Sequence, residues 1–490
     1  MNVYKKLFSQ TLIYGVAAVF PKVIGFIMVP LHIEWMKDES VYGSYSVLFT
    51  WMMLFNALLS FGMETAFFRF YNKLENQTKV KNNSILFICG LTAIFGVATL
   101  TNVNSIASIF DLNPLIVSYL IWILIFDALV VIPFAILRAN EKSFQYSLIR
   151  IINVVINAGL TVVFLYLLPK YIRENPNSAI QSWFKNDFQV GYVFLSNLAA
   201  SLVTFLLVSN NYINIRWKFD WKLNKEMMKY AFPVMIASIA FAVNEGIDRV
   251  LIEHLLPEGI GEAEAGRYSA CYNMGIFMVL FRMAYSLGIE PFFFNYAKNE
   301  DAQLKYATVT KYFIIFGSFA MLGIIVFVDV LKPLLIPKSI YWSAMEIVPY
   351  IILANFMLGI YTNLSVWYKL QDKTYIGAII SLIGAVATIG FNYLLIPKIG
   401  IIGAAITSLI AYSLMLLISY ILGQKAYPIP YDKKAIAIYL TTSTIFSFGY
   451  FYNFRENYFL GIALILIFVG LIYFNEKIMI QRIIKSFLKK

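Results

Sequence analysis

Apolar stretches of about 20 residues recur along the whole chain, and they constrain its fold more than any other feature of the sequence. A helix of that length crosses a hydrocarbon core of about 30 Å, and in lipid only helices and closed barrels satisfy their own backbone polar groups. Charged residues make up only 13% of the chain, roughly half of what a soluble domain carries. The sequence therefore predicts an all-α polytopic membrane protein.

The apolar stretches predict about fourteen transmembrane helices, separated by short polar connections. We expect the first to remain part of the folded protein, because it is too long for a secretory signal and carries Lys22 within it. The expected spans are 8–30, 44–63, 84–101, 115–137, 146–168, 190–208, 230–252, 268–289, 308–330, 345–366, 374–396, 400–422, 434–452 and 457–474.

Most of the 39 lysines and arginines lie in alternate connections, such as Arg69–Lys81, Arg138–Lys142 and Arg216–Lys229. By the positive-inside rule these connections are cytoplasmic, which puts both chain ends in the cytoplasm as well. The net charge of +12 then reflects topology, so we expect no nucleic-acid partner. The two cysteines and two histidines show no metal-site spacing, and we expect neither a metal nor a cofactor.

Short motifs recur in the same order about 223–231 residues apart, which predicts two homologous halves. An even number of spans separates the copies, so the halves should be parallel and related by an axis along the membrane normal. The predicted divisions are a six-helix half at 1–209, a basic connector at 210–229, a second six-helix half at 230–423, and two further helices with a basic tail at 424–490. The paired motifs are Tyr42–Ser46 with Ala265–Ser269, Gly62–Phe68 with Gly288–Phe293, Arg138–Lys142 with Lys369–Lys373, and Tyr166–Lys170 with Tyr393–Lys398.

Charged residues persist inside several spans, although each costs about 2.5–3.5 kcal/mol at mid-membrane on insertion scales. We expect them to face a polar cavity between the halves, and helical spacing supports this: Asn56, Ser60 and Glu64 should share one face of a helix. The candidate substrate-binding residues are Lys22, Arg150, Arg249, Arg282, Asn56 and Asn153. The candidate ion-coupling residues, whose carboxyls could take up protons or sodium, are Asp127, Asp248, Glu64 and Glu290.

Structural roles for these charges remain open alternatives. Glu245 and Arg249 are four residues apart and can neutralise one another along a helix. Glu64 with Arg69, and Glu290 alone, can be interfacial residues at helix ends. Lys22 can extend its ammonium group to the membrane surface.

The span number, the Tyr42–Ser46 turn, and Asp248-Arg249 ahead of Ala265–Ser269 resemble the polysaccharide transporter branch of the multidrug/oligosaccharidyl-lipid/polysaccharide exporter superfamily, and within it the Wzx-type oligosaccharide flippases of bacteria. The resemblance implies an inner-membrane flippase that moves undecaprenyl-pyrophosphate-linked units of O-antigen, capsule or another surface polysaccharide to the periplasmic leaflet by alternating access. It also implies coupling to an ion gradient, and membrane lipid, a polysaccharide polymerase and glycosyltransferases as partners. The cationic lumen of that family is carried over onto Lys22, Arg150, Arg249 and Arg282.

Three other functions stay open at this point. A lipid II flippase would be expected to show more arginines in its first two helices than this chain does, and a drug/cation antiporter would have twelve helices. A membrane-embedded polysaccharide polymerase or ligase should carry a large outer catalytic loop. The longest expected outer connection, Lys170–Gln189, is short and contains no histidine, so we do not expect an enzyme.

Overall fold

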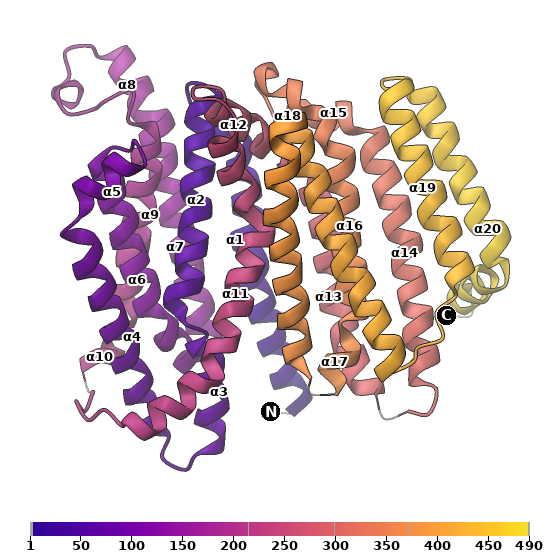
Figure 1. Ribbon diagram of the computed structural model, residues 1–490, viewed down its shortest axis with the longest axis horizontal. Helices are drawn as coiled ribbons and strands as arrows, with labels where there is room; N and C mark the ends of the chain where they lie inside the picture. The colour runs from indigo at the N-terminus through magenta and orange to yellow at the C-terminus, as the bar shows by residue number, and fades with distance from the viewer. Residues whose placement is uncertain (1–2, 214, 298, 372, 489–490) are drawn as a thin grey trace. The chain divides into compact units, whose positions relative to one another are not determined.

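The computed structural model describes the backbone of residues 3–488, except residues 214, 298 and 372. It describes the side chains of residues 19–477, except at those three positions and at residues 287, 288, 290, 291, 294 and 295. The described chain is helical, without strands (Figure 1). It forms two compact units, and each is described by itself. Unit 1 comprises residues 1–253 and 258–266, and unit 2 comprises residues 254–257 and 267–490.

Unit 1 contains α1 to α10, nearly all of α11 and the beginning of α12. Most connections are short, and the longest, between α8 and α9, contains only the short helix η2. Its helices are α1 (Val3–Trp35), α2 (Glu39–Ser60), α3 (Met63–Lys73), α4 (Gln77–Leu100), α5 (Val103–Ile109), α6 (Pro114–Ala139), α7 (Ser143–Val162), the π-helix η1 (Val163–Leu167), α8 (Leu168–Glu174), the 3-10 helix η2 (Ala179–Ser182), α9 (Gln189–Val208), α10 (Asn210–Ile213), α11 (Trp221–Leu255) and α12 (Gly261–Tyr272).

Unit 2 continues from the second part of α12 to the end of the described chain. Its helices are η3 (Asn273–Gly275), α13 (Ile276–Tyr296), α14 (Ala302–Val326), α15 (Val328–Leu335), η4 (Ser339–Ile347), α16 (Val348–Leu364), α17 (Val366–Leu370), α18 (Thr374–Ala426), α19 (Lys433–Asn453) and α20 (Tyr458–Leu488).

Several of these helices begin at a polar residue whose side chain caps the first turn. Asp38 caps α2 by accepting a hydrogen bond from the amide of Val41, and Asn113 caps α6 by accepting one from Leu115. Pro114 follows in the first turn of α6, where its lack of a backbone N–H removes no hydrogen bond within the helix. Each cap accepts a hydrogen bond from a backbone N–H that has no partner within the helix, and so stabilises the beginning of the helix at that residue.

The predicted polytopic helical fold is confirmed. Ten of the described helices, taken with their continuous neighbours, are long and apolar enough to cross a membrane. One of them, α18, has 53 residues and breaks at Ile399 and Gly400, between the two spans expected there. Gly400 has a φ of +61°, a conformation that costs glycine little, so this break divides α18 into two spans.

One expectation about helical faces was wrong. Asn56 and Ser60 lie on α2, but Phe61 and Gly62 both adopt left-handed backbone, with φ of +51° and +63°. Glu64 therefore lies in the first turn of a separate helix, α3, and does not continue the face of Asn56 and Ser60. The break fits a close approach of α11, because a Cβ on Gly62 would lie 2.9 Å from the amide nitrogen of Met235.

The first long helix of the expected second half packs into unit 1. Leu223, Met227 and Ala231 of α11 are buried in one hydrophobic cluster with Met63 and Phe67 of α3. The amide of Asp220, just before α11, donates to Asn83 Oδ1 of α4 at 2.8 Å. By its packing, α11 thus belongs with the helices that precede it. The predicted boundary between the two homologous halves at 210–229 rests on the sequence repeat, and it stays a prediction.

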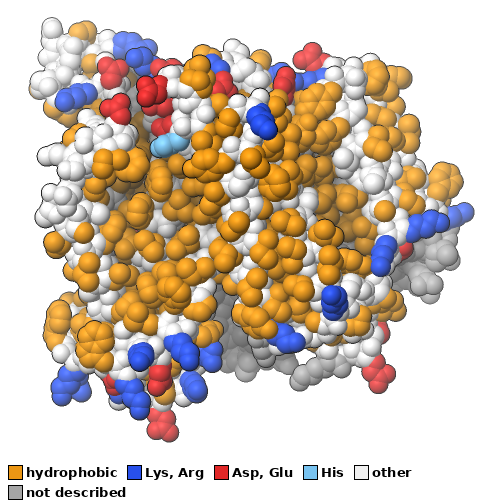
Figure 2. Space-filling model, in the orientation of Figure 1, with side chains coloured by type: hydrophobic (Ala, Val, Ile, Leu, Met, Phe, Trp, Pro, Cys, Tyr) orange, Lys and Arg blue, Asp and Glu red, His pale blue; other side chains and the backbone are white. Residues whose placement is uncertain are grey.

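Side chains are distributed as a membrane protein requires. Figure 2 shows hydrophobic side chains over the middle of the helices and Lys, Arg, Asp and Glu gathered near the helix ends. Many large apolar side chains are exposed in the lipid-spanning stretches, among them Ile94, Phe241 and Val386. Lipid, and not water, is the solvent for this surface.

Candidate functional site

Two glycines, one from each of the tyrosine-containing motifs, pack against each other near the amino-terminal end of α2. Gly43 of α2 and Gly266 of α12 are both buried, and a Cβ added to either would lie 3.0 Å from the other's amide nitrogen. Each such Cβ would also overlap a backbone carbonyl, that of Glu262 for Gly43 and that of Glu39 for Gly266. Glycine at both positions lets the helix backbones touch, as small residues do where membrane helices cross.

Asp127, at the middle of α6, lies in a polar cluster inside unit 1. Ser201 of α9 donates a hydrogen bond to Asp127 Oδ1 at 2.7 Å, and the amide of Asn56 of α2 donates to Oδ2 at 3.3 Å. Arg150 of α7 also interacts electrostatically with this carboxylate. Three helices thus converge on one carboxylate whose direct hydrogen-bond partners are neutral.

Arg150 and Asn153 lie one turn apart on α7. The guanidinium of Arg150 lies 5.0 Å from the ring centre of Phe134, and its side chain is exposed. The amide of Asn153 donates to Thr204 Oγ1 of α9 at 2.9 Å. An exposed cation over an aromatic ring keeps its hydrogen-bond donors available to an anion.

The charged turn of α11 also lies in unit 1. Asp248 is 1% exposed, and Arg249 Nη1 donates to the backbone carbonyl of Glu245 at 2.9 Å. A Cβ on Gly246, on the same turn, would lie 3.0 Å from side-chain atoms of Thr50 and Met53 of α2. The charges of this turn are therefore held where α11 packs closely on α2.

Two other expected site residues lie on the first and third helices of unit 1. Lys22 of α1 has an exposed side chain. Glu64 at the start of α3 forms an ion pair with Arg138 of α6, and not with Arg69. Arg69 instead lies over the ring of Tyr230, 4.3 Å from its centre.

Unit 2 holds the remaining candidates. Arg282 lies on α13 beside α16, where a Cβ on Gly359 would be 3.7 Å from Arg282 Cδ. Ser286 follows one turn later on the same helix. The side chain of Glu290 lies outside the described residues, so its role as a coupling residue stays a prediction.

Sequence reasoning missed several partners of the candidates, namely Arg138, Ser201 and Thr204. A signal for two of them exists, because Asn197, Ser201 and Thr204 recur at helical spacing within the apolar α9. Arg138 lay in a basic connection that was interpreted as a topology signal and as part of a repeated motif, and not as a partner for Glu64. Among the described residues, no group of three His, Cys, Asp or Glu side chains could hold a metal ion.

Solved structures with a similar fold are membrane transport proteins. The lipid II flippase MurJ in an inward closed conformation aligns with a TM-score of 0.72 at 17% identity, covering 95% of this chain and 99% of that chain. An inward-facing multidrug resistance transporter of the MATE family, of the MOP superfamily, aligns with a TM-score of 0.60 at 14% identity, covering 88% of this chain and 96% of that one. At these identities the likeness shows the fold alone.

Sequence comparison adds the family. An uncharacterized membrane protein of Haemophilus influenzae is 21% identical over 308 residues, which cover 61% of this chain and 68% of the relative. Residues 7–281, more than half of the chain, match the family described as polysaccharide biosynthesis protein. The chain is therefore a member of the polysaccharide biosynthesis protein family, with the helical fold found in MurJ and in MATE transporters.

Proposed function

We propose that this protein is a flippase for undecaprenyl-pyrophosphate-linked oligosaccharides. It would move repeat units of a surface polysaccharide, such as O-antigen or capsule, from the cytoplasmic to the periplasmic leaflet of a bacterial inner membrane. Family membership supports a polysaccharide precursor as cargo, and the fold supports transport. The observation that carries the proposal is the set of charged and amide side chains that α6, α7 and α11 place within membrane-spanning helices of unit 1.

The cations are assigned to the pyrophosphate. Arg150 and Arg249 offer planar guanidinium groups that can hold two phosphate oxygens at once, and Lys22 offers a compact point charge. Arg282 would act in the same way from unit 2. The amides of Asn56 and Asn153 suit sugar hydroxyls, while the polyprenyl tail remains in lipid. Alternating access would carry the head group across.

Asp127 is the best-supported candidate for ion coupling. Its oxygens accept hydrogen bonds from the neutral groups of Ser201 and Asn56, so the carboxyl can gain a proton without breaking a direct ion pair. Carboxylate and hydroxyl oxygens are also ligands that a hard cation such as sodium accepts. We assign proton or sodium uptake to this residue, with Asp248, Glu64 and Glu290 as further coupling candidates.

A lipid II flippase is the second candidate, because the fold aligns over nearly the whole chain with a solved lipid II flippase. Both substrates carry a polyprenyl pyrophosphate, and they differ in the sugar and peptide portion. The likeness to MATE transporters keeps an organic-cation antiporter as a third outcome. The substrate head group separates the three functions.

The test is translocation in proteoliposomes that contain one of three cargoes. These are a polyprenyl-pyrophosphate oligosaccharide read by an external lectin, lipid II read by an external binding protein, and a fluorescent organic cation. We expect translocation of the first under an ion gradient, and its loss in Arg150→Gln and Arg249→Gln. Arg173→Gln, in an exposed side chain of α8, is the matched control and should transport normally. Transport of lipid II or of the cation alone would overturn the proposal.

A further inference from the structure

A cavity of about 320 Å³ lies at one end of unit 1, apart from the Asp127 cluster. Its wall is built from the start of α4, the end of α6, the start of α7, and the junction of α9 with α10. All these helix ends belong to connections that the charge distribution predicts to be cytoplasmic. The cavity thus lies where the head groups of the cytoplasmic leaflet would be.

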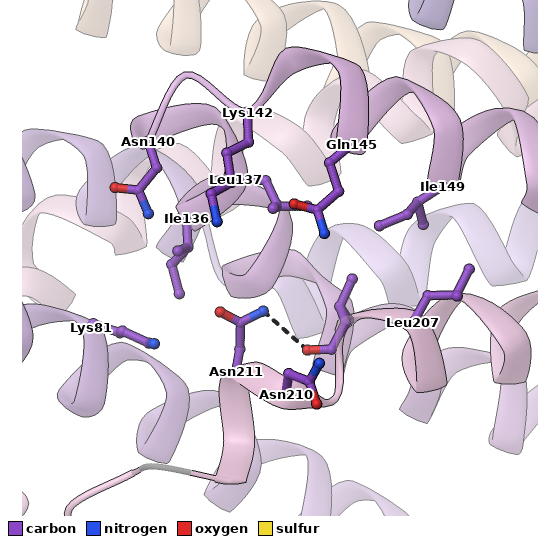
Figure 3. Close-up of a pocket in the computed structure, with 11 residues that line it drawn as sticks. Lys81, Ile136, Leu137, Asn140, Lys142, Gln145, Ile149, Leu207, Asn210 and Asn211 are labelled. Carbon is purple, nitrogen blue, oxygen red and sulfur yellow. Dashed lines mark hydrogen bonds between the residues drawn. The ribbon is translucent and has the colours of Figure 1, made fainter.

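The polar part of the cavity consists of cations and amides. Figure 3 shows the side chains of Lys81 and Lys142 entering the space from different elements, with the amide of Gln145 directed into it from α7. Asn210 and Asn211 of α10 form the opposite wall. The lining contains no aspartate or glutamate among the described residues. An anion would therefore meet donors without meeting a competing carboxylate.

The neighbouring hydrogen bonds orient two of these amides. The hydroxyl of Tyr71 donates to Asn140 Oδ1 at 3.2 Å, which leaves the amide nitrogen of Asn140 as a donor. Asn211 Nδ2 donates to the carbonyl of Val208 at 3.0 Å, which ties α10 to the end of α9. The donor set is thus partly fixed before any ligand binds, and this lowers the entropic cost of binding.

The two lysines differ from the basic residues around them. Lys79, two residues before Lys81, is paired with Asp220, and Arg138 is paired with Glu64. Within the part of the chain that the structure describes, neither Lys81 nor Lys142 forms an ion pair with a carboxylate. Two ammonium groups facing one cavity repel each other, and an anion between them would remove that repulsion.

The rest of the wall is apolar and continues into lipid-exposed surface. Ile136, Ile149 and Val208 are buried in the wall, whereas Leu207 is an exposed side chain at its edge. The first two turns of α7 also expose Phe144. An apolar edge beside a cationic pocket suits a molecule with a charged head and acyl chains, and it offers nothing to a small soluble anion.

We propose that this cavity binds the phosphate head group of an anionic glycerophospholipid of the cytoplasmic leaflet. Lys81 and Lys142 neutralise the phosphate diester, Gln145 and Asn140 donate hydrogen bonds to its oxygens, and the acyl chains lie along the exposed end of α9. The bound lipid would hold α10 against α4, α6 and α7. This site is separate from the one proposed for the transported cargo.

The test measures lipid retention by the full-length purified protein in native mass spectrometry, with phosphatidylglycerol and phosphatidylcholine as probes. We expect phosphatidylglycerol to be retained preferentially and its binding to weaken about thirtyfold in the double variant Lys81→Gln/Lys142→Gln, at about 1 kcal/mol for each lysine. Gln145→Glu, which adds a negative charge at an exposed position and keeps both lysines, should weaken binding as well. Lys170→Gln/Lys185→Gln, two exposed lysines remote from the cavity, is the matched control.

Thermal unfolding of each variant in detergent shows whether it is folded, and transport is not needed for the readout. Equal retention of phosphatidylglycerol by wild type, the double variant and Gln145→Glu would overturn the proposal. Displacement of the lipid by millimolar inorganic phosphate or glycerol phosphate would overturn the assignment to a lipid, because the site would then be one for soluble phosphate. Equal retention of phosphatidylcholine would show that the head-group charge is not recognised.

Discussion

Two carboxylates within the helices, Asp127 in unit 1 and Glu476 in unit 2, have opposite surroundings. Asp127 accepts hydrogen bonds from Ser201 and Asn56, both neutral. Glu476 accepts two hydrogen bonds from the ammonium of Lys311, at 2.8 and 2.9 Å. Hydroxyls of Tyr312 and Tyr439 donate to Glu476 as well, at 3.2 and 3.4 Å.

The difference assigns different roles to them. A carboxylate that is paired directly with a lysine and also accepts hydrogen bonds from tyrosines would lose those interactions on protonation, at a high cost in free energy. Such a carboxylate suits a structural role. Glu476 lies on α20 and Lys311 on α14, so their pair fastens the last helix to the body of unit 2. A carboxylate held by neutral donors can change its charge at lower cost, which is what ion coupling requires.

Removal of the cation beside Glu476 should produce the largest loss of stability. In Lys311→Ala the carboxylate stays largely buried without its counter-ion, at a cost of about 3 kcal/mol. Thermal unfolding in detergent measures this loss. The double variant Lys311→Met/Glu476→Gln removes both charges and should recover most of it. If the single variant were as stable as wild type, Glu476 would not be a structural anchor and the comparison would fail.

Neutralisation of Asp127 should act on transport instead of stability. The new amide oxygen in Asp127→Asn can still accept from Ser201, and Asn56 can rotate its own amide, so we expect a loss of no more than about 1 kcal/mol in unfolding free energy. Gradient-driven translocation in proteoliposomes should fall to the level seen without a gradient. Glu476→Gln is the matched control, with the reverse pattern of reduced stability and retained coupling. Normal coupling in Asp127→Asn would move the coupling role to another carboxylate.

The sequence predicted most of the membrane-spanning helices, but it did not predict which residues pair with the charges that those helices carry. Helix lengths and the break at Gly400 follow from local composition. The repeated motifs singled out the segments that contain Gly43 and Gly266, but they did not predict that these two glycines pack against each other. The pair of Lys311 with Glu476 joins residues 165 apart in the chain. Helical periodicity predicts which face of a helix is polar, but it contains no information on which other helix packs there.

The interrupted face at Phe61 and Gly62 illustrates a second limit. A periodic pattern of Asn56, Ser60 and Glu64 predicts one continuous helix, and nothing in that pattern marks the break. The close approach of Met235 on α11 fits the left-handed turn, and that contact joins segments that lie far apart in the chain. Tertiary packing here overrides local periodicity.

Asp329 of α15, outside the spanning helices, extends the comparison to a carboxylate with two cations. Arg455 donates two hydrogen bonds to it, both at 2.7 Å, and Lys332 donates one at 2.6 Å. Burial alone would raise the pKa of Asp329, but the hydrogen bonds from Arg455 and Lys332 outweigh burial and lower it below its ordinary value of 3.8. Because its pKa is lowered in the folded protein, the carboxylate of Asp329 stabilises the fold fully at pH values above its ordinary pKa of 3.8. This stabilisation is lost as the pH falls through the lowered pKa.

We therefore expect the melting temperature of wild type to fall on acidification below about pH 4, partly because Asp329 becomes protonated. Asp329→Asn should be less stable at neutral pH, by about 1–2 kcal/mol, and should lose that part of the acid dependence. Melting curves from about pH 3 to 7 measure both effects. An Asp329→Asn variant with the same acid dependence as wild type would show that other carboxylates account for it.

The smallest expected effects come from single hydroxyl donors, and they test whether neutral donors matter more to Asp127 than to Glu476. Ser201→Ala removes one of the two direct hydrogen bonds to Asp127, and we expect a loss of about 1 kcal/mol. Tyr439→Phe removes a longer hydrogen bond from Glu476, which keeps Lys311 and Tyr312, so a loss of only about 0.5 kcal/mol is expected. Ser201→Ala should also shift the pH dependence of translocation, because it changes the surroundings of the coupling carboxylate, whereas Tyr439→Phe should leave that dependence unchanged. If Tyr439→Phe shifted the profile and Ser201→Ala did not, the roles of the two carboxylates would be exchanged.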